Sequence, residues 1–144
     1  MSNTSKIIIF LVDDDALFLK SLELEFLENA DFEVYTFATG EECIVNLSKK
    51  PDLIILDYYL DGLNKTAMNG IDTLDRIKEI NSKVPVVMLS SQDKIDIAIS
   101  CMHHQAFDYV VKSETSFVRL QKIITTIFQN NELEKHLNWY MDRM

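Results

Sequence analysis

The chain has 144 residues, 47% of them hydrophobic and 26% charged, with a formal net charge of −9. This length and apolar content predict one globular domain with a core of its own and exclude a disordered chain. The acidic balance argues against a nucleic-acid surface, so we expect no direct nucleic-acid binding by this chain.

The first third of the chain predicts two strands, each followed by a helix. Residues 6–12 form a continuous apolar run, typical of a strand buried on both faces, and residues 32–37 alternate as an edge strand does. Apolar residues at helical spacing predict helices over 16–28 and 41–49. Asp15 precedes the first helix and is well placed to cap it.

The rest of the chain continues this order. Two further strands are predicted over 53–57 and 84–89, separated by a polar loop and a helix that starts after Asn69 and carries apolar residues on one face. Asp93 is placed to cap a helix that runs to about His104.

A fifth strand over 107–111 and a helix over 115–128 complete the series. Five successive strand–helix units imply right-handed crossovers and a parallel sheet with helices on both faces, an α/β fold.

The tail departs from this pattern. Apolar residues recur at spacings of four, three and four, a short coiled-coil-like seam, at Leu133, Leu137, Tyr140 and Met144. The tail is either a terminal helix folded back on the domain or a helical extension used for pairing or linking, and we favour the extension.

The cysteines and the N-terminus indicate the compartment. Cys43 and Cys101 are far apart, with no CxxC motif and no histidine at metal-ligand spacing. Residues 1–6 form a short polar lead rather than a signal peptide, and the longest apolar run is too short to cross a bilayer. We therefore expect a reduced cytoplasmic protein with buried thiols and no membrane contact.

Charged residues stand where the predicted buried strands end. Asp13 and Asp14 follow the first strand, Asp57 ends the third and Lys112 follows the fifth. Because the functional crevice of an open α/β sheet lies at the carboxyl ends of its strands, we expect these groups to meet there. Clustered carboxylates repel one another, and a hard cation such as Mg²⁺ relieves the repulsion. The pattern predicts a site for Mg²⁺ and a phosphoryl group, with Asp57 as the nucleophile.

These landmarks resemble the receiver domain of two-component response regulators. The resemblance covers roughly residues 6–129 and rests on five features in order: the acidic pair Asp13–Asp14, then Asp57, Ser90, Tyr109 and Lys112. It implies a flavodoxin-like (βα)5 doubly wound parallel sheet with strand order 2-1-3-4-5. The expected organisation is a receiver domain over 1–129 with a helical C-terminal extension over 130–144.

The resemblance also implies a role for each residue. Asp14 and Asp57 would bind Mg²⁺ directly, Asp13 partly through water, and Tyr59 through its backbone carbonyl. Lys112 and the Ser90 hydroxyl would contact the phosphoryl group on Asp57. A histidine kinase or a phosphotransfer protein would be the donor.

The signal would then pass through Ser90 and Tyr109 to the surface of the fourth and fifth helices, which a second copy or a downstream protein would read. The chain would catalyse only its own phosphorylation and dephosphorylation, so it would not be an enzyme acting on an external metabolite.

Two assignments leave alternatives open. A shift of register by one residue would exchange Ser90 for Ser91, and Tyr109 is either the switch residue or an ordinary core aromatic. Tyr59 and Gln92 occupy the two positions that modulate phosphoryl lifetime in this family. Because Tyr59 is bulky enough to hinder the attacking water, we expect a long-lived aspartyl phosphate.

The chain also departs from the family pattern at two places. Ser113 stands where a proline with a cis peptide is usual, and a cis bond before serine costs roughly 3 kcal/mol. The turn is therefore either rebuilt in trans or strained. The loop over 58–69 is longer than usual. It could form part of a partner surface or partly cover the site, but we favour a tolerated surface insertion.

Two other function classes compete. A Mg²⁺-dependent phosphatase of the haloacid-dehalogenase type would share the nucleophilic aspartate but needs an acid two residues later, where this chain has Tyr59. A pseudo-receiver would keep only the fold as a binding platform, and the intact Asp57 and Lys112 argue against it.

Overall fold

The structure, a computed structural model, describes residues 6–62 and 66–142, with side chains described up to residue 129. Its centre is a five-stranded parallel sheet in the order β2-β1-β3-β4-β5, which confirms the predicted fold and strand order. The strands, in chain order, are β1 (Ile7–Val12), β2 (Phe32–Phe37), β3 (Leu53–Asp57), β4 (Val86–Ser90) and β5 (Asp108–Val111).

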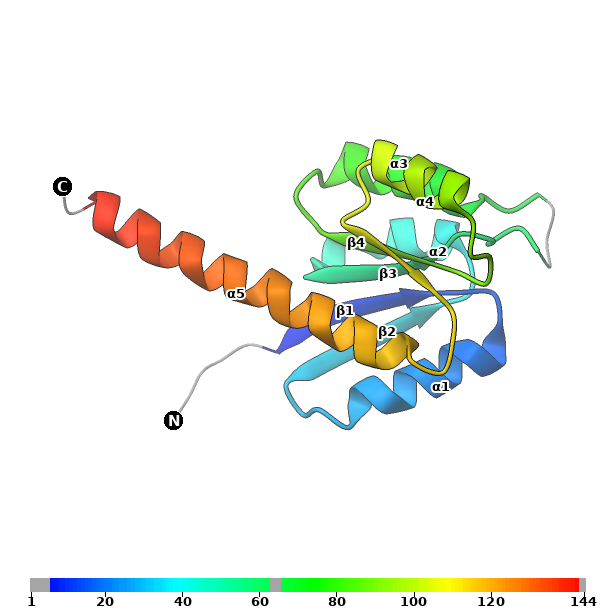
Figure 1. The fold of residues 1–144 in the computed structure, drawn as a ribbon, viewed down its shortest axis with the longest axis horizontal. Helices are drawn as coiled ribbons and strands as arrows, with labels where there is room; N and C mark the ends of the chain where they lie inside the picture. The colour runs from blue at the N-terminus through cyan, green and yellow to red at the C-terminus, as the bar shows by residue number, and fades with distance from the viewer. Residues whose placement is uncertain (1–5, 63–65, 143–144) are drawn as a thin grey trace.

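Helices cover both faces of the sheet (Figure 1). They are α1 (Ala16–Leu27), α2 (Gly40–Val45) with a 3₁₀ turn η1 (Leu47–Lys49), α3 (Gly70–Ile80), α4 (Ile95–His103) and α5 (Ser116–Asp142). Side chains of β1, β3 and β4 alternate between two cores, as the strand period requires. One core packs against α2, α3 and α4, and the other against α1 and α5. The three inner strands are therefore buried on both faces, which explains their continuous apolar sequence.

The predicted helix starts are right at α1 and wrong at α4. The Asp15 carboxylate accepts hydrogen bonds from the backbone N–H groups of Leu17 and Phe18, both at 3.2 Å, and so caps α1. At α4 the cap position is Lys94, which makes no side-chain capping bond, so the predicted cap at Asp93 is incorrect. Hydrogen bonds between the Gln92 backbone and the side chains of Ser90 and Tyr109 hold the loop before α4 instead.

Boundaries of a helix and a strand also differ from the sequence prediction. The α-helix predicted over 41–49 ends at Val45 and continues as η1, and the fourth strand starts at Val86, after Pro85.

The largest difference is α5, which runs without a break to Asp142 instead of ending near Phe128. No glycine or proline lies between Ser116 and Asp142, and asparagine inside a helix costs less than about 0.7 kcal/mol relative to alanine. The second half of α5 extends away from the sheet (Figure 1). The seam side chains from Leu133 to Met144 lie outside the described residues.

Both cysteines are buried and unpaired, as predicted. Burial raises the pKa of Cys43 to about 12 and that of Cys101 to about 11, so neither thiol forms a reactive thiolate near neutral pH. Among the described helices, none combines the length and the apolar character that a membrane span needs.

Candidate phosphoacceptor site

Three carboxylates meet at the carboxyl edge of the sheet. Asp13 and Asp14 follow β1, and Asp57 is the last residue of β3, the strand beside β1. One oxygen from each of the three residues lies within 4.8 Å of the others. Asp13 and Asp57 are buried and Asp14 is half-buried. The predicted meeting of these side chains at one edge is confirmed.

Lys112 reaches the same cluster from the end of β5, the edge strand of the sheet. Its backbone N–H donates to the Ser90 carbonyl at 2.8 Å, directly after β5. Its Nζ lies 2.7 Å from Asp13 Oδ2 and 3.5 Å from Asp57 Oδ1, and its side chain is only 16% exposed. The ammonium also lies over the ring of Phe18, 4.5 Å from the ring centroid. Lys112 therefore pairs with two of the three clustered carboxylates, those of Asp13 and Asp57.

Burial and the excess of negative charge shift the pKa values of Asp57 and Lys112. Burial and then the charge of Asp13 raise the pKa of Asp57 to about 7 from an ordinary 3.8, although Lys112 and the Tyr59 backbone N–H oppose the rise. Burial by itself would lower the pKa of Lys112, but its contacts with Asp13 and Asp57 outweigh burial and raise it. The site therefore holds its lysine charged and destabilises the charge on Asp57.

The donor set fits a hard divalent cation. Asp13 Oδ2 is buried and accepts no hydrogen bond of normal geometry among the described residues, although the Lys112 ammonium lies beside it. Three carboxylates that each place an oxygen within 4.8 Å of the others are the oxygen-rich environment that Mg²⁺ prefers.

The Tyr59 carbonyl and the Asp14 carboxylate both lie close to Gly62. A Cβ atom placed on Gly62 would lie 3.3 Å from Asp14 Oδ2 and 4.0 Å from the Tyr59 carbonyl oxygen. A side chain at position 62 would therefore crowd the Asp14 carboxylate, and glycine lets the loop lie close to it. The loop that follows β3 lies against the acidic cluster at Gly62, a residue that sequence reasoning did not select.

Ser90, rather than Ser91, belongs to the strand. It is the last residue of β4 and is fully buried, whereas Ser91 is exposed. It comes directly after Leu89, the β4 partner of Asp57, so it lies at the same edge of the sheet. Its hydroxyl accepts a hydrogen bond from the Gln92 N–H at 3.0 Å.

Tyr109 is connected to Ser90 through Gln92. The Tyr109 ring is half-buried against the core under α4, and its hydroxyl donates to the Gln92 carbonyl. The backbone N–H of Gln92 therefore binds Ser90, and its carbonyl binds Tyr109. Sequence reasoning named Gln92 for another role and missed this one, because a backbone contact leaves no trace in residue type.

The turn after Lys112 contains no cis peptide bond; the described residues have none. Side-chain hydroxyls hold it instead. The buried Ser116 Oγ accepts from the Ser113 N–H at 2.7 Å and lies 2.9 Å from the Ser113 carbonyl and 3.3 Å from the Val111 carbonyl. Of the two alternatives left by the sequence, the trans turn is the one observed.

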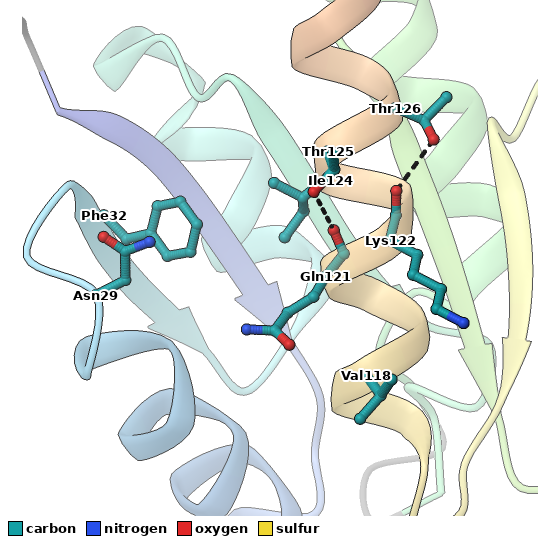
Figure 2. A pocket seen from close by; sticks show the side chains of 8 residues that line it. All are labelled: Asn29, Phe32, Val118, Gln121, Lys122, Ile124, Thr125 and Thr126. Atoms are coloured by element: carbon teal, nitrogen blue, oxygen red, sulfur yellow. Dashed lines mark hydrogen bonds between the residues drawn. The ribbon is translucent and has the colours of Figure 1, made fainter.

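A groove of about 590 Å³ lies elsewhere, between the α1–β2 turn and α5 (Figure 2). Asn29 and Phe32 line one side, and Val118, Gln121 and Lys122 line part of the other. Among the described residues that line it, Lys122 is the one that carries a charge, so they do not form an acidic cluster like that of the sheet edge. We therefore place the site by its chemistry and not by cavity size.

Comparison with known proteins decides the family. The model of the response regulator receiver domain matches residues 9–125, which include every predicted site residue. The chain belongs to this family. Receiver domains are the phosphorylation-dependent switches of two-component signalling, and their strand order and acidic edge are those found here.

Curated relatives are longer than this receiver domain. The two-component response regulator ORR27 of Oryza sativa subsp. japonica is 32% identical over 108 residues, 75% of this chain and 17% of that protein. A protein-glutamate methylesterase/protein-glutamine glutaminase of Bacillus subtilis is 38% identical over 111 residues, 74% of this chain and 29% of that protein. The chain thus spans less than a third of either relative.

Solved structures agree on the fold. A crystal structure of a CheX-CheY-BeF3-Mg complex from Borrelia burgdorferi matches with a TM-score of 0.72 and 25% identity, covering 85% of this chain and 90% of that one.

Proposed function

We propose that this receiver domain accepts a phosphoryl group on Asp57 from a histidine kinase or a phosphotransfer protein, in a reaction that requires Mg²⁺. The observation that carries this proposal is the arrangement of Asp13, Asp14 and Asp57 within 4.8 Å, with the Lys112 ammonium beside two of them. A family relative whose structure contains BeF3 and Mg supports the same chemistry.

The residues that would hold Mg²⁺ are Asp13, Asp14, Asp57 and the carbonyl of Tyr59. The ion would neutralise charge on the carboxylates and on the transferring phosphoryl oxygens. It would also make the ionised form of Asp57, the form that can attack, more favourable at neutral pH.

The chain's own groups supply the rest of the reaction. A free oxygen of Asp57 attacks phosphorus and the donor's bond to phosphorus breaks, so an aspartyl phosphate forms and the donor leaves with the bonding electrons. The Lys112 ammonium, already held at the cluster, balances the added charge. The Ser90 hydroxyl lies at the same edge and would turn from the Gln92 N–H to donate to a phosphoryl oxygen.

The signal would leave the site through Gln92. A change at the Ser90 hydroxyl alters one side of the Gln92 backbone, while the Tyr109 hydroxyl binds the other side. The ring of Tyr109 packs under α4, so this contact leads from the site to the surface of α4 and α5. A downstream protein or a second copy would bind that surface.

Incubation with acetyl phosphate and Mg²⁺ tests the reaction. Intact-mass measurement should show one phosphoryl group per chain with Mg²⁺ and none without it. Phosphate release should continue slowly and in proportion to the decay of this species. Rapid turnover of a small phosphate ester would indicate a phosphatase, and failure to gain mass or bind Mg²⁺ would indicate a pseudo-receiver.

We further propose that the receiver domain over 1–129 uses the helical extension over 130–144 for pairing with a second copy or for linking. The continuity of α5 and its direction away from the sheet support this role (Figure 1).

A further inference from the structure

The Lys112 side chain has to span a wide part of the site. It starts after β5, at one border of the sheet, and its ammonium meets Asp13, which follows β1; β3 and β4 lie between these strands. A lysine stem is flexible, with about 2 kcal/mol of rotamer entropy. Its ionic partners, Asp13 and Asp57, are also the residues whose charge and bonding change when the site reacts.

Phe18 is a partner that does not change. It lies in the first turn of α1, where its backbone N–H is bound by the Asp15 cap. Its half-buried ring packs with the core under α1 and α5, and the Lys112 ammonium lies 4.5 Å from the ring centroid. This distance is inside the range of about 6 Å over which a ring attracts a cation. A phenyl ring attracts the ammonium but can neither take its proton nor bind a metal.

We propose that Phe18 is a positioning residue, whose ring keeps the Lys112 ammonium at the acidic cluster while Asp13 and Asp57 exchange partners during phosphorylation. This inference rests on the proposed function. The capped first turn of α1 fixes the ring, and the ring fixes the side chain that balances charge on the phosphoryl group.

Matched substitutions isolate the ring's effect. Phe18→Leu keeps an apolar side chain but removes the π face, and we expect phosphorylation by acetyl phosphate to slow by about three- to tenfold. Phe18→Tyr restores the ring and should restore most of the rate. Phe26→Leu is the control, because Phe26 is on the same helix and contacts Phe117 rather than Lys112.

A double-mutant comparison shows whether the effect passes through the lysine. In Lys112→Met, which keeps the apolar stem without the charge, adding Phe18→Leu should cause no further slowing. An equal slowing in both backgrounds would mean that Phe18 acts through helix packing, and would overturn the inference.

A spectroscopic readout is independent of the reaction. With ¹³C-labelled lysine, the ε-methylene resonance of Lys112 should show a ring-current shift in the wild type and in Phe18→Tyr. The shift should vanish in Phe18→Leu and persist in Phe26→Leu. An unshifted wild-type resonance, or an equal rate in Phe18→Leu, overturns the inference alone. If the wild type gains no phosphoryl group, the proposed function fails and the positioning role fails with it.

Discussion

At the scale of single residues, the charge on Asp57 is the property that most constrains the site. Its carboxylate is buried beside Asp13, and among the described residues Lys112 is the cation that pairs with it. Such an arrangement opposes stability in the metal-free protein, and a bound cation would offset the repulsion between the carboxylates. Stability and function are therefore coupled at this residue.

The pH dependence of stability should reveal this coupling. Because the pKa of Asp57 rises from 3.8 to about 7 on folding, the folded protein holds a proton that the unfolded chain has released. The free energy of unfolding of the metal-free protein should therefore fall as pH increases from about 4 to about 7.

Asp57→Asn should remove most of this fall, and Mg²⁺ should reduce it in the wild type. Urea unfolding at about pH 5 and about pH 8, with and without Mg²⁺, measures the difference. The same pH dependence in the wild type and the variant would contradict a destabilising charge on Asp57.

Tyr59 should control how long the phosphoryl group survives. Its side chain is 39% exposed and packs edge-on against Tyr58, and its carbonyl faces Gly62, which lies against Asp14. Tyr59→Asn opens a path for water, so dephosphorylation of the purified phospho-protein should become several-fold faster. Tyr59→Phe keeps the ring and should decay like the wild type. Equal decay of all three proteins would exclude Tyr59 as a shield.

The sequence could predict the charged residues of the site but not their supports. Asp13, Asp57 and Lys112 each end or follow an apolar strand, and parallel strands bring such positions to one edge. Phe18 looks like any apolar helix residue, and its contact with Lys112 depends on the tertiary fold. The Asp93 prediction failed because the helix starts one residue later than predicted, so the cap position falls on Lys94.

At the scale of elements, the turn from Val111 to Ser116 fixes the base of Lys112. The buried Ser116 hydroxyl binds the Ser113 N–H and approaches two backbone carbonyls. The spacing of Ser113 and Ser116 is visible in the sequence. The hydrogen bond between them occurs in a trans turn, however, and the sequence left the conformation of that turn open.

Ser116→Ala should destabilise the protein by about 1–3 kcal/mol, because buried backbone groups lose their partner. Ser113→Ala removes exposed hydroxyl contacts with the Thr115 N–H and the Thr115 hydroxyl and should cost less. Urea unfolding of the two variants provides the comparison. If Ser116→Ala is as stable as the wild type, the hydroxyl does not hold the turn.

At the scale of the whole molecule, alternating strand and helix periods were sufficient to predict the fold class, and the family resemblance supplied the strand order. The length of α5 was not predictable in the same way. The sequence predicts an end near Phe128, yet the Asn130–Asn131 pair only weakens a helix, and no glycine or proline stands between Ser116 and Asp142. The sequence therefore predicted a helix end near Phe128, where the observed helix continues.

Removing residues 130–144 should leave the receiver domain folded and active. The family match ends at residue 125, and the two described cores include no residue beyond Phe128. We expect normal thermal unfolding and phosphorylation, with loss of any self-association seen by sedimentation equilibrium in the full chain. Unchanged self-association after truncation would place pairing on the domain itself.

The most direct measurement is the position of the phosphoryl group. After incubation with acetyl phosphate and Mg²⁺, borohydride trapping followed by peptide mass mapping should mark Asp57 alone. The mark should be absent in Asp57→Asn and in the presence of a chelator. A mark on another residue, or one that persists in Asp57→Asn or without Mg²⁺, would contradict the assignment of this site.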